Sequence, residues 1–175
     1  MKGKAWLIGA GVLGLAVAGS VAAHDRDHHS RIATVLRSIE EVPAVSSPAR
    51  GFFKATIDTN NQTLSYELSY EGIEGAPLQA HIHLGQAAVN GDVSVFLCAN
   101  VPAPAGTPAC PVGPATVTGT LTAASVLGPA TQGLAPGDFD ALVAAIRKGV
   151  TYVNVHSTRF VRGEIRGQLD NPSKK

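Results

Sequence analysis

Apolar and polar residues alternate with a period of two over much of this chain. Every second residue from Leu64 to Tyr70 is apolar, and the residues between them are polar. Successive side chains of a β-strand point to opposite faces, so this pattern predicts a strand with one buried face. Residues 51–59 are predicted to pair with this strand as a hairpin, with 58–62 as the turn.

Other segments predict more strands and one helix. Five further strands are expected at 78–84, 93–97, 116–121, 151–156 and 163–169. A helix is expected to be capped by Gly137 or Asp138 and to end at Gly149. Its apolar stripe consists of Phe139, Leu142, Val143 and Ile146. Seven short strands and one short helix indicate an all-β fold, an antiparallel β-sandwich or flattened barrel of the superoxide-dismutase-like or immunoglobulin-like kind.

The first residues have the order of a secretory signal peptide. Lys2 and Lys4 precede an uncharged apolar stretch, and small residues follow it up to Ala23. Cleavage is expected after Ala23, or one residue earlier, which predicts a periplasmic or secreted protein without stable membrane insertion. The alternative is an uncleaved membrane anchor, since the apolar run of 19 residues from Ala5 to Ala23 is just long enough to span a bilayer.

The rest of the chain is expected to form one domain. Residues 24–49 are polar and contain two prolines, so we expect a flexible leader with one short helical turn at 32–39. The domain is predicted at 50–170, and 171–175 form a tail. The 14 basic and 13 acidic residues are nearly balanced and show no basic stripe, which argues against a nucleic-acid partner.

The two cysteines fit an exported protein. Cys98 and Cys110 bracket a loop rich in proline and glycine, and in an oxidising compartment they predict a disulfide. A metal–thiolate pair is the alternative, but no neighbouring residue would complete such a site.

Three histidines are candidate metal ligands. His81 and His83 alternate on one strand, so both imidazoles leave the same face, and His156 lies on a second predicted strand. Three neutral imidazole nitrogens suit copper or zinc, and among divalent ions copper(II) binds such donors most tightly. The alternative is a structural network in which these histidines bond to polar groups of the protein.

Other polar residues are expected to support this site or to act apart from it. Tyr152, Asn154 and Glu164 are candidates for orienting the imidazole rings. His24, His28 and His29 form a possible auxiliary metal site, or only a solvated segment. The alternation of Glu164, Arg166 and Gln168 favours cross-strand pairing over catalysis. No nucleophile with an attendant base is visible, so we expect no enzyme, apart from possible redox chemistry at a bound copper.

Three segments resemble the CHRD domain family, a module first described in chordin. They are 80–85 with Asn90-Gly91 following, 144–149, and 152–156 running into 163–169. Ala88 and Val161 depart from the family pattern, and both lie in connections. The resemblance implies an extracellular binding module, whose partner would be a protein outside the cytoplasm. Two functions therefore follow: metal storage, transfer or buffering by an exported copper protein, or a metal-free scaffold for an extracellular or periplasmic partner.

Overall fold

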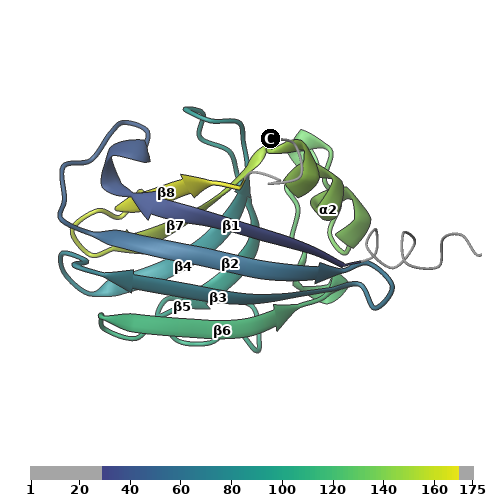
Figure 1. Cartoon of the computed structure of the whole chain (residues 1–175), viewed down its shortest axis with the longest axis horizontal. Helices are drawn as coiled ribbons and strands as arrows, with labels where there is room; N and C mark the ends of the chain where they lie inside the picture. Colours follow the sequence, from purple (N-terminus) through teal and green to yellow (C-terminus); the bar gives the residue numbers. More distant parts are fainter. Residues whose placement is uncertain (1–28, 170–175) are drawn as a thin grey trace, which may run out of the picture.

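The computed structural model describes residues 29–169 (Figure 1). The predicted signal peptide, His24, His28 and the predicted tail lie outside the described residues. The strands are β1 (His29–Arg37), β2 (Arg50–Asp58), β3 (Thr63–Glu71), β4 (Pro77–Leu84), β5 (Val93–Ala99), β6 (Ala115–Leu121), β7 (Thr151–Ser157) and β8 (Ile165–Gln168). The helix α2 spans Phe139–Lys148, and short 3-10 turns lie at Ser38–Glu40, Ala123–Ser125 and Ala130–Gln132.

The strands form one antiparallel sheet that curls into a flattened barrel. The eight strands follow the order β5-β4-β7-β8-β1-β2-β3-β6, which leaves β5 and β6 as the two edges. Figure 1 shows β1, β2, β3 and β6 as one wall and β4, β5 and β7 behind it. Tyr66 on β3 donates a hydrogen bond of 2.5 Å across the barrel to the carbonyl of Leu97 on the edge strand β5. The predicted all-β flattened barrel with one short helix is confirmed.

The alternation of each strand fills the space between the walls. Phe53 and Leu68 from one wall, and Ile82 and Val153 from the other, are completely buried in a continuous apolar core. Side chains at the intervening positions point away from the barrel interior. The predicted hairpin is confirmed, because β2 and β3 pair in register from Arg50 opposite Glu71 to Asp58 opposite Thr63.

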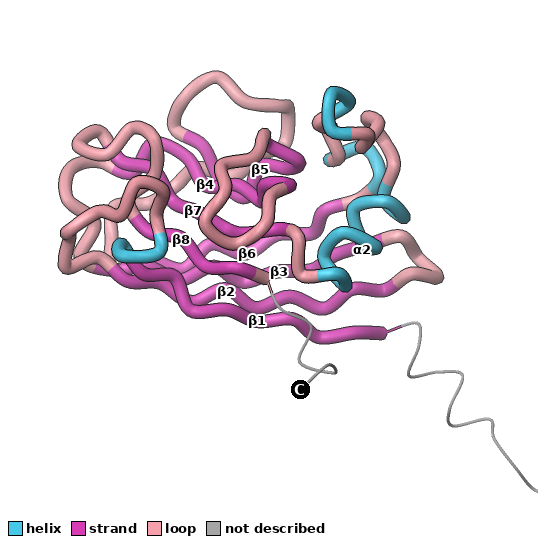
Figure 2. Tube along the Cα trace, turned by 90° about the horizontal axis from the view of Figure 1, so that it is seen from above, coloured by secondary structure: helices cyan, strands magenta, loops and turns pink. Residues whose placement is uncertain are grey.

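Helix α2 lies at one end of the barrel (Figure 2). Its predicted limits are confirmed: the Asp138 carboxylate accepts from the backbone N–H of Ala141, and Gly149 ends the helix in a left-handed conformation. Leu142 and Ile146 on its apolar stripe are fully buried. The helix therefore covers one open end of the core.

The expected flexible leader is wrong for the part that the structure describes. Residues 29–37 form β1, a central strand that pairs with β2 along its whole length and touches β8 at Arg37. Ile32 and Leu36 are both buried, and their spacing of four fits one face of a strand as well as one turn of a helix. Pairing to distant residues decides for the strand, so the folded domain begins before residue 50.

The cysteine loop is closed as predicted. The sulfur atoms of Cys98 and Cys110 lie 2.00 Å apart, the length of a disulfide. Asn100 also holds this loop, donating from its amide to the carbonyl oxygens of Pro77 and Cys110. Among residues 29–169, no helix is long and apolar enough to cross a membrane.

Candidate metal site

The pairing of β4 with β7 brings the three predicted histidines together. His81 lies opposite Asn154, His83 lies opposite Tyr152, and His156 is one pair further along β7. Facing residues of antiparallel strands share a sheet face, so all these side chains lie on the outer face of this wall. One nitrogen from each histidine can be chosen so that all three lie within 4.8 Å of one another. The prediction that the three imidazoles meet is therefore confirmed in the structure.

Although the histidines lie outside the barrel core, they are buried. Their exposed fractions are 1% for His81, 7% for His83 and 6% for His156. The ring of Phe96 on β5 packs edge-on against His81, with centroids 4.3 Å apart. The connections around Gly91 and Val161 cover the other rings, because the backbone carbonyls of these two residues contact His83 and His156.

These carbonyls fix which nitrogen of each ring carries a proton. A carbonyl oxygen can only accept, so Nδ1–H of His83 donates to Gly91 over 2.9 Å and Nδ1–H of His156 donates to Val161 over 3.1 Å. The Nε2 atoms of both rings then keep their lone pairs, which are the atoms that bind metals. His81 Nδ1 lies 3.3 Å from His156 Nε2 and can donate its proton there. The Nε2 atom of His81 is buried without a hydrogen-bond partner, and that of His83 has no close partner, although the Asn154 side chain interacts with this ring.

Asn154 adds an oxygen to this cluster. Its side chain hydrogen-bonds to Glu41, which orients the amide nitrogen toward that carboxyl group. The amide oxygen then lies 3.0 Å from His156 Nε2. With the His156 proton on Nδ1, this places two acceptors face to face without a proton between them. A bound cation would stabilise such a contact.

Stacked rings hold His83 in place. The rings of His83 and Tyr152 are nearly parallel, with centroids 4.7 Å apart. The guanidinium carbon of Arg166 lies 3.4 Å from the centroid of the Tyr152 ring. Arg166 in turn donates to the carbonyls of Gln86 and Val89, at 3.0 and 2.8 Å. A buried cation thus fixes the loop above the site and the aromatic ring beside it.

Burial keeps the imidazoles neutral. It lowers the pKa of His81 to about 2, with nearby His156 and His83 adding to the effect. It also lowers the pKa of His83 to about 4, although the Gly91 carbonyl opposes this, and it lowers the pKa of His156. Burial raises the pKa of Glu41 to about 7, against the attraction of Arg166. At neutral pH, all three imidazoles therefore offer lone pairs.

Not every predicted residue joins the cluster. Tyr152 and Asn154 contact the histidines, but the Glu164 carboxylate instead accepts from the hydroxyl of Ser47 and the backbone N–H of Glu74. His29 lies at the start of β1, where its Nε2 is 3.1 Å from an Asp58 oxygen, and it is no part of the three-histidine group.

Sequence reasoning missed Glu41, the stacking role of Arg166 and the two carbonyls that orient the rings. Glu41 lay in the segment expected to be a leader. The stacking of Arg166 on Tyr152 depends on the register of β7 and β8, which places Arg166 opposite Asn154 and one pair from Tyr152. That register is set by strand pairing in the folded protein and could not be predicted from the alternation alone. The carbonyl contacts have no sequence signal, because any residue type provides a carbonyl oxygen.

The distances fit a transition metal. Imidazole nitrogens bound at about 2.0–2.1 Å in tetrahedral geometry lie about 3.3 Å from one another. His81 Nδ1 and His156 Nε2 already have this separation, 3.3 Å, so an ion bound there replaces the hydrogen bond between them and leaves the His81 proton on Nε2. Since the whole group spans 4.8 Å, its nitrogens need to converge by roughly 1.5 Å at most. The residues present therefore fit an ion such as copper or zinc.

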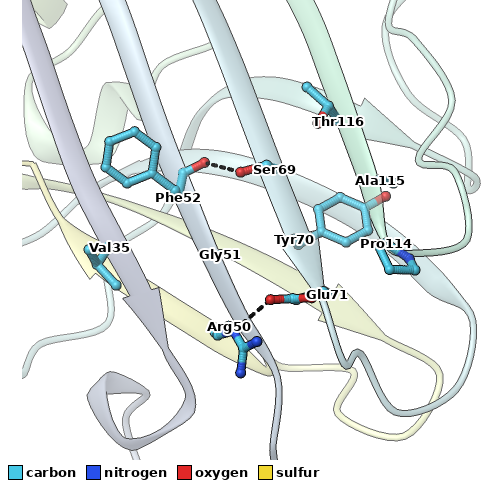
Figure 3. A pocket seen from close by; sticks show the side chains of 10 residues that line it. All are labelled: Val35, Arg50, Gly51, Phe52, Ser69, Tyr70, Glu71, Pro114, Ala115 and Thr116. Carbon is cyan, nitrogen blue, oxygen red and sulfur yellow. Dashed lines mark hydrogen bonds and ion pairs between the residues drawn. The ribbon is translucent and has the colours of Figure 1, made fainter.

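A second feature lies on another wall of the barrel. A hollow of about 460 Å³ lies over β1, β2, β3 and β6, where Val35 and Phe52 are 49% and 41% exposed (Figure 3). An ion pair of 2.6 Å between Arg50 and Glu71 closes one side of it. The one basic and the one acidic side chain that line the hollow pair with each other, so its lining carries no net charge.

Over residues 29–169, the fold and this covered histidine cluster define an all-β barrel-like domain with a candidate metal site on its outer face. Residues 32–169 match the CHRD domain family, and the chain belongs to it. No curated protein and no solved structure matches the chain significantly. The family and the disulfide both fit a protein outside the cytoplasm.

Proposed function

We propose that this protein is an exported binding module that holds a transition-metal ion, copper before zinc, between His81, His83 and His156. Its role is metal storage, transfer or buffering in the periplasm or outside the cell, rather than turnover. The observation that carries the proposal is the convergence of one buried ring nitrogen from each of the three histidines within 4.8 Å, in a cluster where the Nε2 atoms of His81 and His83 have no close hydrogen-bond partner.

A purely structural network explains this observation less well. A buried polar atom left without a partner costs about 1–3 kcal/mol, so a network evolved for stability would pair its nitrogens. The imidazole lone pairs instead face one another across a few ångströms. A metal ion would take one lone pair from each ring, and the Gly91 and Val161 carbonyls hold the rings of His83 and His156 in the way that supporting groups do in metal sites.

Metal analysis of the purified protein tests the proposal. We expect about one equivalent of copper after incubation with copper and removal of excess ion, and less than about a tenth of that in the His81→Ala, His83→Ala double variant. His29→Ala is the matched control, since it removes an exposed histidine outside the cluster. Equal metal in the double variant and the wild type, with both folded by circular dichroism, would exclude these ligands.

The metal-free scaffold remains a prediction. It would require a partner that binds with unchanged affinity in the presence of a chelator. It would also leave the convergent lone pairs of the histidines without a purpose.

A further inference from the structure

If the cluster holds a metal, as proposed above, its chemistry also selects the charge of the ion. The group contains three imidazole nitrogens and, among the described residues, neither a thiolate nor a carboxylate. The oxygen of Asn154, 3.0 Å from His156 Nε2, belongs to a neutral amide. The carboxyl group of Glu41 hydrogen-bonds to Asn154 and not to a histidine, and burial raises its pKa to about 7, so it is only partly ionised at neutral pH. What charge it has is attracted to Arg166, whose own positive charge acts on His83. The ligands therefore supply no negative charge to balance a cation.

Burial makes this lack of compensation costly for a divalent ion. The three histidines are between 1% and 7% exposed, so a bound ion loses most of its contact with water. The cost of transferring an ion from water to a medium of low dielectric constant grows with the square of its charge, so a dication meets about four times the cost of a monocation of equal size. An uncompensated, buried site consequently favours the monocation.

The number of donors points the same way. Zinc in proteins is almost always four-coordinate, and copper(II) prefers a tetragonal arrangement. Phe96 packs edge-on against His81 and Tyr152 stacks on His83, so aromatic carbon lies against two of the three rings. The further donor at the cluster is the amide oxygen of Asn154, a ligand type that suits magnesium and calcium better than zinc or copper. Copper(I) has a filled d shell and accepts two or three nitrogen donors, so it needs no more than the cluster offers.

We infer that the cluster of His81, His83 and His156 binds copper as Cu(I), in preference to Cu(II) and Zn(II). The protein then buffers or transfers reduced copper. Cu(II) binds more weakly than Cu(I) at this site, because its second charge is buried among ligand atoms that are all neutral.

Anaerobic competition titrations test this inference. Cu(I), supplied as its acetonitrile complex, is titrated against a chromophoric Cu(I) chelator, and Cu(II) and Zn(II) sulfates are titrated against chelators of known affinity. We expect Cu(I) to bind with a dissociation constant at least about 100-fold lower than that of either divalent ion. Equal or tighter binding of Cu(II) or Zn(II) would overturn the inference and leave the proposed function intact. No binding of any of the three ions would overturn the proposed function itself.

A single substitution tests the charge argument directly. Asn154→Asp replaces the neutral amide beside His156 by a carboxylate of the same shape. We expect the ratio of the Cu(II) to the Cu(I) dissociation constant to fall by at least about ten-fold in this variant, since the substitution adds a negative charge beside the ion. Asn61→Asp is the matched control, because it makes the same change in the exposed turn between β2 and β3. An unchanged preference in folded Asn154→Asp protein would contradict the charge argument. If this variant does not fold, the affinities of the wild-type protein for the three ions still test the inference.

Discussion

Gly91 shows how one residue links the backbone to the candidate metal site. Its carbonyl accepts from Nδ1 of His83, and its backbone N–H lies 3.2 Å from the Tyr152 hydroxyl. A Cβ at this position would lie 1.7 Å from the carbonyl oxygen of Leu84, a backbone atom that cannot turn aside. Only glycine allows this loop to approach β4 so closely, and the close approach is what orients the ligand ring.

We therefore expect Gly91→Ala to destabilise the protein by roughly 3 kcal/mol or more, since the loop must move off the sheet. Urea denaturation of the metal-free protein measures the change. Ala88→Gly in the same loop is the control. Ala88 has a φ of 59°, so glycine relieves backbone strain in the folded protein, but it also raises the conformational entropy of the unfolded chain. The two effects nearly cancel, and the control should change stability by less than about 0.5 kcal/mol. Similar losses in both variants would show that the loop is merely sensitive to substitution.

Among the elements, β1 is the strand that the polar composition of its segment fails to predict. It lies between β8 and β2 in the sheet, so its removal would separate two internal strands, whereas removal of β5 or β6 would only shorten the sheet at an edge. Its residues Ile32 and Leu36 belong to the common core. The segment looks polar because its outward positions carry charged residues such as Arg31 and Arg37.

A chain that begins at Ala49 should consequently fail to fold, whereas a chain that begins at His29 contains every described strand and should fold. The expected result is loss of near-ultraviolet circular dichroism and of a cooperative thermal transition in the shorter chain only. A cooperative transition in the chain that begins at Ala49 would show that β1 is dispensable.

The same elements show what sequence can predict here. Local periodicity and capping predict strands β3 and β4 and helix α2, because residues close together in the sequence form the buried face of each element. β1 does not, because the spacing of Ile32 and Leu36 fits two periods. For the site, alternation places His81 and His83 on one face, but the register of β4 on β7 depends on pairing between residues about 70 positions apart. The resemblance to the CHRD family predicted the kind of domain, but it did not predict the contacts of Glu41 or the stacking of Arg166.

For the molecule as a whole, the buried imidazoles couple folding to pH. The pKa of His83 is lowered to about 4 and that of His81 to about 2, from an ordinary value of 6.5. Below pH 6.5 these imidazoles bind protons in the unfolded chain but stay neutral in the folded protein. The free energy of unfolding therefore decreases as the pH falls from 6.5 toward 4. Each imidazole contributes up to about 1.4 kcal/mol per pH unit.

Glu41 acts in the opposite direction. Its pKa is raised to about 7 from 4.5, so the folded protein keeps a proton that the unfolded chain releases, and the stability from this group is lost as the pH rises from 4.5 to 7. Three imidazoles outweigh one carboxyl group. The free energy of unfolding of the metal-free protein should therefore fall by at least about 1 kcal/mol between pH 6.5 and pH 5.

Urea midpoints measured across this range, with metal removed, check the expected fall. Glu41→Gln should steepen it, because the opposing group is gone, and His83→Gln should flatten it by about one imidazole's share. A slope unchanged by His83→Gln would mean that this ring takes up its proton equally in the folded and unfolded states, which its burial at 7% exposure opposes. Because a bound metal requires neutral rings, the same burial that makes the metal-free barrel sensitive to acid keeps its ligands ready for the ion at neutral pH.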